Sequence, residues 1–302
     1  MEKKYKLTEE TINVCSRTLY RIEALKDFND VKKGDKGGYV EDEENLSQSG
    51  DCWVYDDAKV YGDAKVCDNA EVFGDAMVYD NAKIRNHASV CGDARVYGNA
   101  KVRGNAMVYG DAVISDKATI SGDTEIFNSA EVYGNAKICD NAVVFDSAQV
   151  YGDAVVYGYT MVFGNARVYG NAKICGDAMV YGNAEVYDKA IVCGDAMVYD
   201  YAEVYGSAEV FSKAKVFDNA KVFDNAEVYD EAKVFEDARI YGNAKICGVT
   251  WVFDKAEFSG NTIVHGNAEV YDNGAVYGDG LVYDNAEIYG DREVHGNEKV
   301  GE

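Results

Sequence analysis

The sequence contains no proline, only two tryptophans and three histidines among its 302 residues. Proline has no backbone N–H to donate and is excluded from central strands, so its absence favours a chain in which almost every N–H is paired. Long apolar runs are also missing, since no segment approaches the roughly 18 consecutive apolar residues of a membrane helix. We therefore expect no membrane-spanning helix and no membrane partner.

Signals for export are lacking as well. The first residues, Met1-Glu2-Lys3-Lys4-Tyr5-Lys6, are charged and are not followed by the apolar run of a signal peptide. We therefore expect a cytoplasmic protein. The eight cysteines are spread along the chain and would remain thiols in a reducing cytosol.

Basic residues are scarce, because 30 lysines and arginines face 53 aspartates and glutamates and leave a net charge of −23. Affinity for DNA rests largely on cations that neutralise phosphates, so we expect no direct binding of nucleic acid. The charge leaves room for a basic protein partner, such as a nucleic-acid-binding protein. The alternative is that it only keeps a tyrosine-rich surface in solution.

What the chain does contain is a six-residue repeat. The 246 residues from Val54 to Lys299 divide into 41 hexads without an insertion or deletion. Position 1 is Val or Ile in every hexad except the one that starts at Phe258, and position 5 is Ala in 33 of the 41. The run Ala-x-Val-Tyr alternates inward and outward residues as a short strand does, and Gly, Asp or Asn then supplies a corner. Each hexad therefore predicts one strand and one turn.

The outward residues at position 2 indicate how many hexads form a coil. When every third hexad is taken, the series from Tyr55 is aromatic at 13 of 14 places and the series from Tyr61 at 11 of 14. The series from Cys67 is aromatic at only 4 of 13 places and holds five of the six position-2 cysteines. Three faces of different character predict three hexads per coil, and hence a triangular parallel β-solenoid of about 14 coils.

A branched aliphatic residue followed four positions later by a small one resembles the hexapeptide repeat of left-handed β-helices. The stretches Gly37-Gly38-Tyr39-Val40-Glu41 and Gly50-Asp51-Cys52-Trp53-Val54 look like the entry into the solenoid of YdcK-like hexapeptide proteins of bacteria and phages. This resemblance implies the left hand of the helix. It also implies an acyltransferase by analogy of fold alone.

The two ends differ from the repeat. Residues 1–41 lack it and are expected to form a small β-rich cap, followed by the solenoid over residues 42–302. Near the C-terminus, inward position 5 changes to Gly274, Gly280, Arg292 and Glu298. Inward charge at the edge of a sheet opposes end-to-end stacking, so we expect it to oppose filament growth.

Candidate sites lie on the outward positions. Cys175 and Cys193 are three hexads apart, so we expect them to stack closely enough to pair if oxidised. We assign Met161, Met179, Met197 and Trp251, at position 6, to the face of these cysteines, where they would make a soft, less charged strip. This strip is either an interface or only a row of like residues that stack on neighbouring coils. Exposed phenylalanines on the first aromatic face are expected to form a contact between copies of the chain; they are Phe127, Phe145, Phe163, Phe217, Phe235 and Phe253.

Catalytic chemistry is not indicated. His87 lies at a corner, His265 and His295 lie at outward position 2, and none is accompanied by an inserted loop. We therefore expect no catalytic residue, metal site or cofactor. The leading hypothesis is a non-enzymatic β-solenoid that offers a rigid, acidic, aromatic surface to a protein partner or a second copy. The alternatives are an inhibitor that imitates the charge of nucleic acid and a hexapeptide-type acyltransferase.

Overall fold

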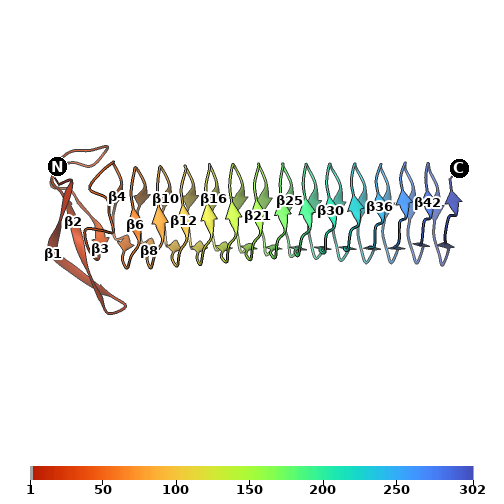
Figure 1. Cartoon of the computed structure of the whole chain (residues 1–302), viewed down its shortest axis with the longest axis horizontal. Coiled ribbons are helices and arrows are strands. Elements are labelled where there is room, and N and C mark those ends of the chain that lie inside the picture. Colours follow the sequence, from red (N-terminus) through yellow and green to blue (C-terminus); the bar gives the residue numbers. More distant parts are fainter. Residues whose placement is uncertain (1–2, 302) are drawn as a thin grey trace. The chain divides into compact units, whose positions relative to one another are not determined.

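The computed structural model describes residues 3–301 and is built entirely of strands and turns over that range. No helix long and apolar enough to cross a membrane is found in these residues. The chain forms two compact units, the first ending at Ser147 and the second beginning at Ala148. Each unit is a stack of parallel coils, so the prediction of an all-β solenoid is confirmed (Figure 1).

The first unit begins with three longer strands (Figure 1). Strands β1 (Tyr5–Val14) and β2 (Arg17–Ala24) form an antiparallel hairpin, and β3 (Lys36–Val40) pairs antiparallel with β2. The other edge of β3 pairs in parallel with β5 (Lys59–Val60). Strand β3 therefore joins the hairpin to the coils, and the boundary expected after residue 41 stays a prediction.

From β4 onward every strand has two residues, position 6 of one hexad and position 1 of the next. We name each face of a unit after its first short strand. In the first unit, the β4 face comprises β4 (Trp53–Val54), β7 (Glu71–Val72), β10 (Ser89–Val90), β13 (Met107–Val108), β16 (Glu125–Ile126) and β19 (Val143–Val144). The β5 face comprises β5, β8 (Met77–Val78), β11 (Arg95–Val96), β14 (Val113–Ile114) and β17 (Glu131–Val132). The β6 face comprises β6 (Lys65–Val66), β9 (Lys83–Ile84), β12 (Lys101–Val102), β15 (Thr119–Ile120) and β18 (Lys137–Ile138).

The second unit repeats this arrangement. Its β20 face comprises β20 (Gln149–Val150), β23 (Arg167–Val168), β26 (Glu185–Val186), β29 (Glu203–Val204), β32 (Lys221–Val222), β35 (Arg239–Ile240), β38 (Glu257–Phe258), β41 (Ala275–Val276) and β44 (Glu293–Val294). Its β21 face comprises β21 (Val155–Val156), β24 (Lys173–Ile174), β27 (Ile191–Val192), β30 (Glu209–Val210), β33 (Glu227–Val228), β36 (Lys245–Ile246), β39 (Ile263–Val264), β42 (Leu281–Val282) and β45 (Lys299–Val300). Its β22 face comprises β22 (Met161–Val162), β25 (Met179–Val180), β28 (Met197–Val198), β31 (Lys215–Val216), β34 (Lys233–Val234), β37 (Trp251–Val252), β40 (Glu269–Val270) and β43 (Glu287–Ile288).

The register confirms three hexads per coil. Val54 pairs with Val72, and in the second unit Met161 pairs with Met179. The entry coil is longer, because Val40 pairs with Val60 and Leu46 bridges to Val66, two positions more than three hexads in each case. This irregular coil lies before the first strict hexad and brings the total to about 15 coils.

The core consists of the two inward positions of each hexad. Position 1 is fully buried from Val54 to Val294, as is Ala at nearly every position 5. Backbone N–H groups donate to the next coil, as from Tyr55 N to Val72 O at 2.8 Å. At the corners position 3 has a positive φ, 50° at Asp56 and 67° at Gly62, which explains why Gly, Asp and Asn fill it.

Candidate interaction face

On the β22 face, two outward rows flank the buried valines. The position-6 row begins with Met161, Met179 and Met197, which pair in register and are half-buried. It continues with Lys215, Lys233 and Trp251. Lys233 lies 4.3 Å from the centroid of the Trp251 ring. The row therefore offers polarizable, uncharged groups next to two cations.

The position-2 row of this face is an aromatic ladder. Successive rings stack with centroids 4.8 to 5.6 Å apart and planes within 13° of parallel. The row holds Phe163, Tyr181, Tyr199, Phe217, Phe235, Phe253, Tyr271 and Tyr289. Because each ring covers its neighbours, the phenylalanines are half-buried, less exposed than the sequence suggested. Stacked pairs contribute about 0.5–1.5 kcal/mol beyond their buried area, so the ladder also stiffens the face.

Exposed aromatic residues stand at the corners beside this face. Tyr159, just before β22, is 68% exposed, and Tyr201, just after the ladder residue of β28, is 64% exposed. Among the described residues of the second unit, seven large hydrophobic residues are exposed, and five lie on the β22 face or its corners: Tyr159, Tyr201, Val249, Trp251 and Tyr289. Exposed apolar side chains are normally scattered singly, so this concentration marks a candidate contact surface.

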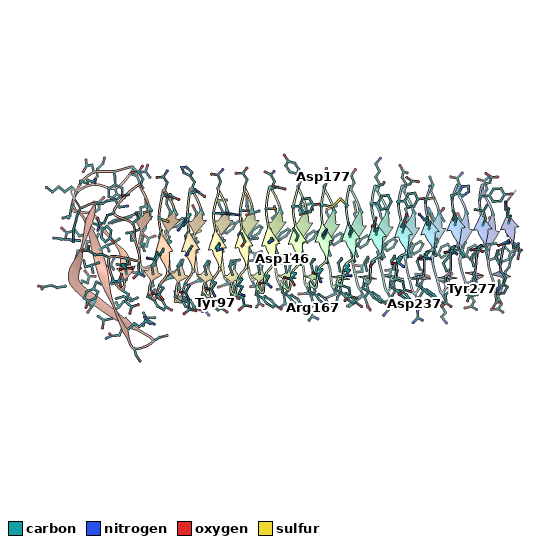
Figure 2. The ribbon with its side chains drawn as sticks, viewed as in Figure 1. Tyr97, Asp146, Arg167, Asp177, Asp237 and Tyr277 are labelled. Carbon is teal, nitrogen blue, oxygen red and sulfur yellow. A yellow bond between two sulfur atoms is a disulfide. The ribbon has the colours of Figure 1, made fainter. Side chains whose placement is uncertain are left out.

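The charge of the face differs from that of its edges. Neither strand row carries a carboxylate from Met161 to Phe253, although the chain has 53 acidic residues. Carboxylates stand at many of the corners on both sides, beginning with Asp177 on one side and Asp200 on the other, and Figure 2 labels two of them, Asp177 and Asp237. The face is thus a carboxylate-free strip of methionine and aromatic side chains, with Lys215 and Lys233 in its position-6 row, between acidic borders.

Neighbouring groups shift the pKa of residues along the strip. Burial, with the nearby Tyr181 and Asp200, raises the pKa of Tyr199 to about 12. The ladder phenol at this position therefore stays neutral across the physiological range. On the acidic border, a hydrogen bond with Asp254 raises the pKa of Glu236 above its usual value.

The cysteines and the methionines occupy different faces. Cys175 and Cys193 follow β24 and β27 on the β21 face, where their sulfurs form a disulfide, drawn as a yellow bond in Figure 2. The sequence had placed the position-6 methionines and Trp251 on the face of these cysteines, and that prediction was wrong. Position 6 comes after the corner and is the first residue of the next strand, which belongs to the β22 face.

The expectation that these two cysteines stack closely enough to pair is confirmed, and in this structure they are bonded; the expectation of thiols in a reducing cytosol stays a prediction. Their spacing of one coil brings the two Cα atoms to 4.5 Å, so adjacency was predictable although the bonded state was not. In the first unit, Phe127 lies in a ladder between Tyr109 and Phe145, with centroids 4.8 and 5.0 Å away. A contact between copies of the chain through these phenylalanines stays a prediction.

The histidines lie apart from one another in the sequence and on the coils. His87 is an exposed corner residue, and His265 stacks 6.0 Å from Tyr283. His295 lies 5.5 Å from Tyr277, and its Nε2 is 2.6 Å from a carboxylate oxygen of Glu293. No group of three His, Cys, Asp or Glu side chains that could hold a metal occurs in residues 3–301.

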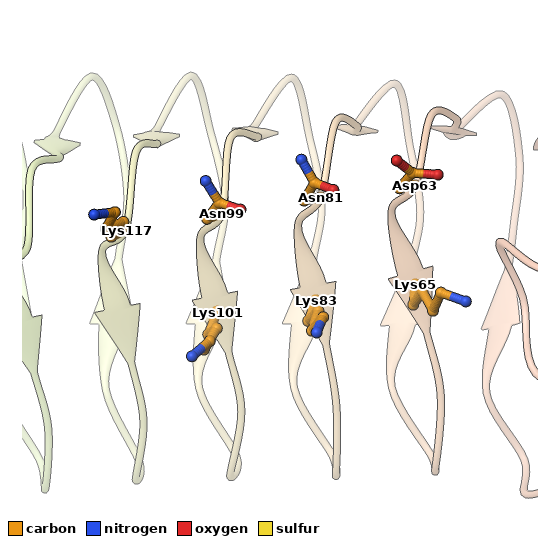
Figure 3. A pocket seen from close by; sticks show the side chains of 7 residues that line it. All are labelled: Asp63, Lys65, Asn81, Lys83, Asn99, Lys101 and Lys117. Atoms are coloured by element: carbon orange, nitrogen blue, oxygen red, sulfur yellow. The ribbon is translucent and has the colours of Figure 1, made fainter.

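One cluster was missed by the sequence reasoning. On the β6 face, Lys65, Lys83 and Lys101 pair in register along an open groove of about 630 Å³ (Figure 3). The sequence did carry a signal for this cluster, because position 6 is Lys in three hexads that are spaced three hexads apart. It was overlooked because the charge was averaged over the whole chain and only position 2 was compared between coils.

Two comparisons with known proteins agree with this architecture. The family model described as YdcK Beta solenoid repeat matches residues 148–162. A curated relative, named "Uncharacterized acetyltransferase YdcK" in Escherichia coli (strain K12), is 42% identical over 57 residues, which is 18% of this chain and 18% of the relative. The expected resemblance to the YdcK group is confirmed over these stretches. The matched segment spans less than a fifth of the relative's length.

Proposed function

We propose that this chain is a binding solenoid whose β22 face docks onto a protein with an apolar patch bordered by lysines and arginines. The observation that carries the proposal is the absence of carboxylates from the two strand rows between Met161 and Phe253, together with exposed hydrophobic side chains on this face and at its corners. Aromatic residues and methionine are enriched at the centres of protein interfaces, whereas acidic residues are depleted there.

The construction of the face favours binding. Each ladder ring is held by its neighbours, so little freedom of the aromatic side chains remains to be lost on association, and strand pairing fixes the backbone of the methionine row. Methionine adapts its shape to a partner surface at low cost. Tyr159 and Tyr201 extend beyond the strip and supply the large amphipathic side chains that commonly anchor an interface.

The acidic borders distinguish two candidates for the partner of the β22 face, a second copy of the chain and a different protein. If a second copy covered the strip, its own carboxylate rows would face those of the first copy, and the repulsion would oppose the contact. A partner with a basic border gains attraction at the same positions. Charge complementarity therefore favours a different protein, bound more weakly as salt rises.

The test compares two glutamate substitutions at equivalent outward positions. Met179→Glu places a carboxylate in the centre of the strip, and Ile191→Glu does the same at position 6 of β27 on the β21 face. The partner is captured on immobilised protein, purified, and titrated against the wild type and both variants at low and high salt. We expect Met179→Glu to weaken binding at least about tenfold, because a carboxylate would be desolvated against apolar groups, and Ile191→Glu to leave it unchanged.

Three outcomes overturn the proposal. Equal binding by both variants removes the β22 face from the contact. Self-association of the wild type in sedimentation, abolished by Met179→Glu, identifies a second copy as the occupant. Competition by duplex DNA for the partner, with Met179→Glu binding normally, shows instead that the acidic array imitates nucleic acid.

A further inference from the structure

The β6 face of the first unit carries a row of cations that the repeat does not require. Lys65, Lys83 and Lys101 are the first residues of β6, β9 and β12, and they pair in register with one another. Strands in a sheet lie about 4.8 Å apart, so like charges repeat at that spacing, which is unfavourable unless an anion lies beside them. Arg85 and Arg103 follow β9 and β12 as a second row.

Some lysines of the second unit are neutralised by a carboxylate one coil away, whereas Lys215 and Lys233 pair in register with each other. In the second unit, Lys221 pairs with Glu203 at 2.7 Å and Lys245 with Glu227 at 2.9 Å, each on the neighbouring coil. On the β6 face, Lys65 contacts the exposed Glu44 at 3.3 Å. Within residues 3–301, no ion pair forms at Lys83, Lys101, Lys117, Arg85 or Arg103. A chain with net charge −23 thus leaves five neighbouring cations without an ion pair, although Asp63 lines the same groove.

The cations line a concave surface. Figure 3 shows the three lysines along successive strands, with Asp63, Asn81, Asn99 and Lys117 along the adjoining corners. These seven residues line the open groove of about 630 Å³. A second hollow of about 250 Å³ is lined by Lys83, Lys101, Arg85 and Arg103 together with Val102. Lys83 and Lys101 belong to both, so they form the centre of the site.

The form of the site indicates the class of ligand. Three lysines at equal spacing match a short chain of anionic groups better than one anion. Lysine binds phosphate as a point charge, and arginine binds its oxygens as a fork. The position-2 row of the face holds Cys67, Arg85, Arg103 and Ser121, which gives bases no aromatic surface on which to stack. Because the cation row is interrupted at Thr119 and the chain is strongly acidic, a long polyanion would be repelled.

We infer that the β6 face binds a short linear oligophosphate, whose phosphates lie along Lys65, Lys83 and Lys101 with Arg85 and Arg103 beside them. The ligand is free oligophosphate or the phosphate chain of a nucleotide, and the two share the same contacts. This site is on the first unit and is independent of the docking face proposed for the second.

The experiment is calorimetric titration of the full chain with inorganic tripolyphosphate at constant ionic strength. The variant Lys83→Gln with Lys101→Gln removes the two central cations, and Lys173→Gln, at position 6 of β24, is the matched control. We expect saturable binding by the wild type and the control, and at least about a tenfold loss in the double variant, since each ammonium–phosphate contact is charge-assisted. Tripolyphosphate should also raise the melting temperature of the wild type but not of the double variant.

Further ligands distinguish the sources. ADP that binds no tighter than pyrophosphate supports recognition of the phosphate chain alone, and ADP that binds tighter supports a nucleotide as the source. Sulfate binding as tightly as tripolyphosphate, or a sulfated oligosaccharide binding more tightly, overturns the inference. Equal binding by the double variant, or no heat and no thermal shift at millimolar tripolyphosphate, overturns it as well.

Discussion

At the scale of single residues, the inward position 5 tolerates little besides alanine. Four of its exceptions are threonines, and three of their hydroxyls, on Thr124, Thr160 and Thr262, are buried without a partner in the described residues. Thr250 differs, because its hydroxyl donates to the carbonyl oxygen of Cys247 at 2.6 Å. The same residue type at equivalent positions therefore has opposite consequences for stability.

We expect Thr160→Ala to raise the free energy of unfolding by about 1 kcal/mol, because it removes an unpaired buried hydroxyl. Thr250→Ala should lower it by about 1 kcal/mol, because it removes a made hydrogen bond. Denaturant unfolding of the two variants beside the wild type checks both values. A shift of the same sign in both would contradict the assignment of the hydroxyls.

At the scale of strand and corner, each coil depends on a left-handed residue whose backbone touches the next corner. Gly176 has φ +73°, and a Cβ there would lie 2.8 Å from the nitrogen of Gly194. Gly290 has φ +63° with nothing within 4 Å of the same position. Gly290→Ala should therefore cost about 1 kcal/mol from the backbone alone. Gly176→Ala should cost at least twice as much, measured by the same denaturant unfolding, and equal losses would show that the stacked corners yield freely.

The disulfide joins two neighbouring strands of the β21 face, β24 and β27, one coil apart. Closing a loop of that size restricts the unfolded chain and contributes about 3 kcal/mol in the entropic model. Cys175→Ser with Cys193→Ser should lower the unfolding midpoint under oxidising conditions. The reduced wild type should unfold at the same midpoint as this double variant. Cys247→Ser, a change at a free cysteine, should leave the unfolding midpoint of the oxidised protein unchanged. A midpoint unaffected by reduction would mean that the bond is absent from the purified protein.

At the scale of the whole molecule, periodicity made the fold predictable and hid the sites. The alternation within the hexad fixes which side chains are buried, and the recurrence at every third hexad fixes which ones stack, so Val72 could be placed against Val54 without coordinates. When each hexad is counted from its buried Val, however, position 6 is grouped with the turn before it and not with the strand that it begins. Met179 was consequently placed on the wrong face.

Net charge had the same effect on the β6 face. A total of −23 conceals a local row of cations, because composition carries no position. The redox state of Cys175 and Cys193 could not be predicted from the sequence, for another reason. Their proximity follows from their spacing, whereas their oxidation depends on the environment. The exposure of the phenylalanines depends on ring orientation, which the ladder sets.

The acidic corners make stability depend on pH. The raised pKa of Glu236 arises mainly from its hydrogen bond with the Asp254 side chain. A carboxyl whose pKa is higher in the folded state holds its proton more tightly there, so its contribution is present below the usual glutamate pKa of 4.5 and is lost as pH rises through the raised value. The thermal midpoint should therefore fall as pH increases from 4.5 through the mildly acidic range. Repulsion within the acidic array should add to this fall and weaken with salt.

Asp254→Asn should flatten that part of the profile, because Glu236 then loses the carboxyl that raises its pKa. Asp177→Asn, which removes an equal charge from an exposed corner, is the matched control and should keep the slope. The measurement is the thermal midpoint of the three proteins from mildly acidic to neutral pH at fixed salt. Equal flattening by both variants would attribute the pH dependence to total charge, whereas flattening by Asp254→Asn alone would locate it in one pair of stacked corners.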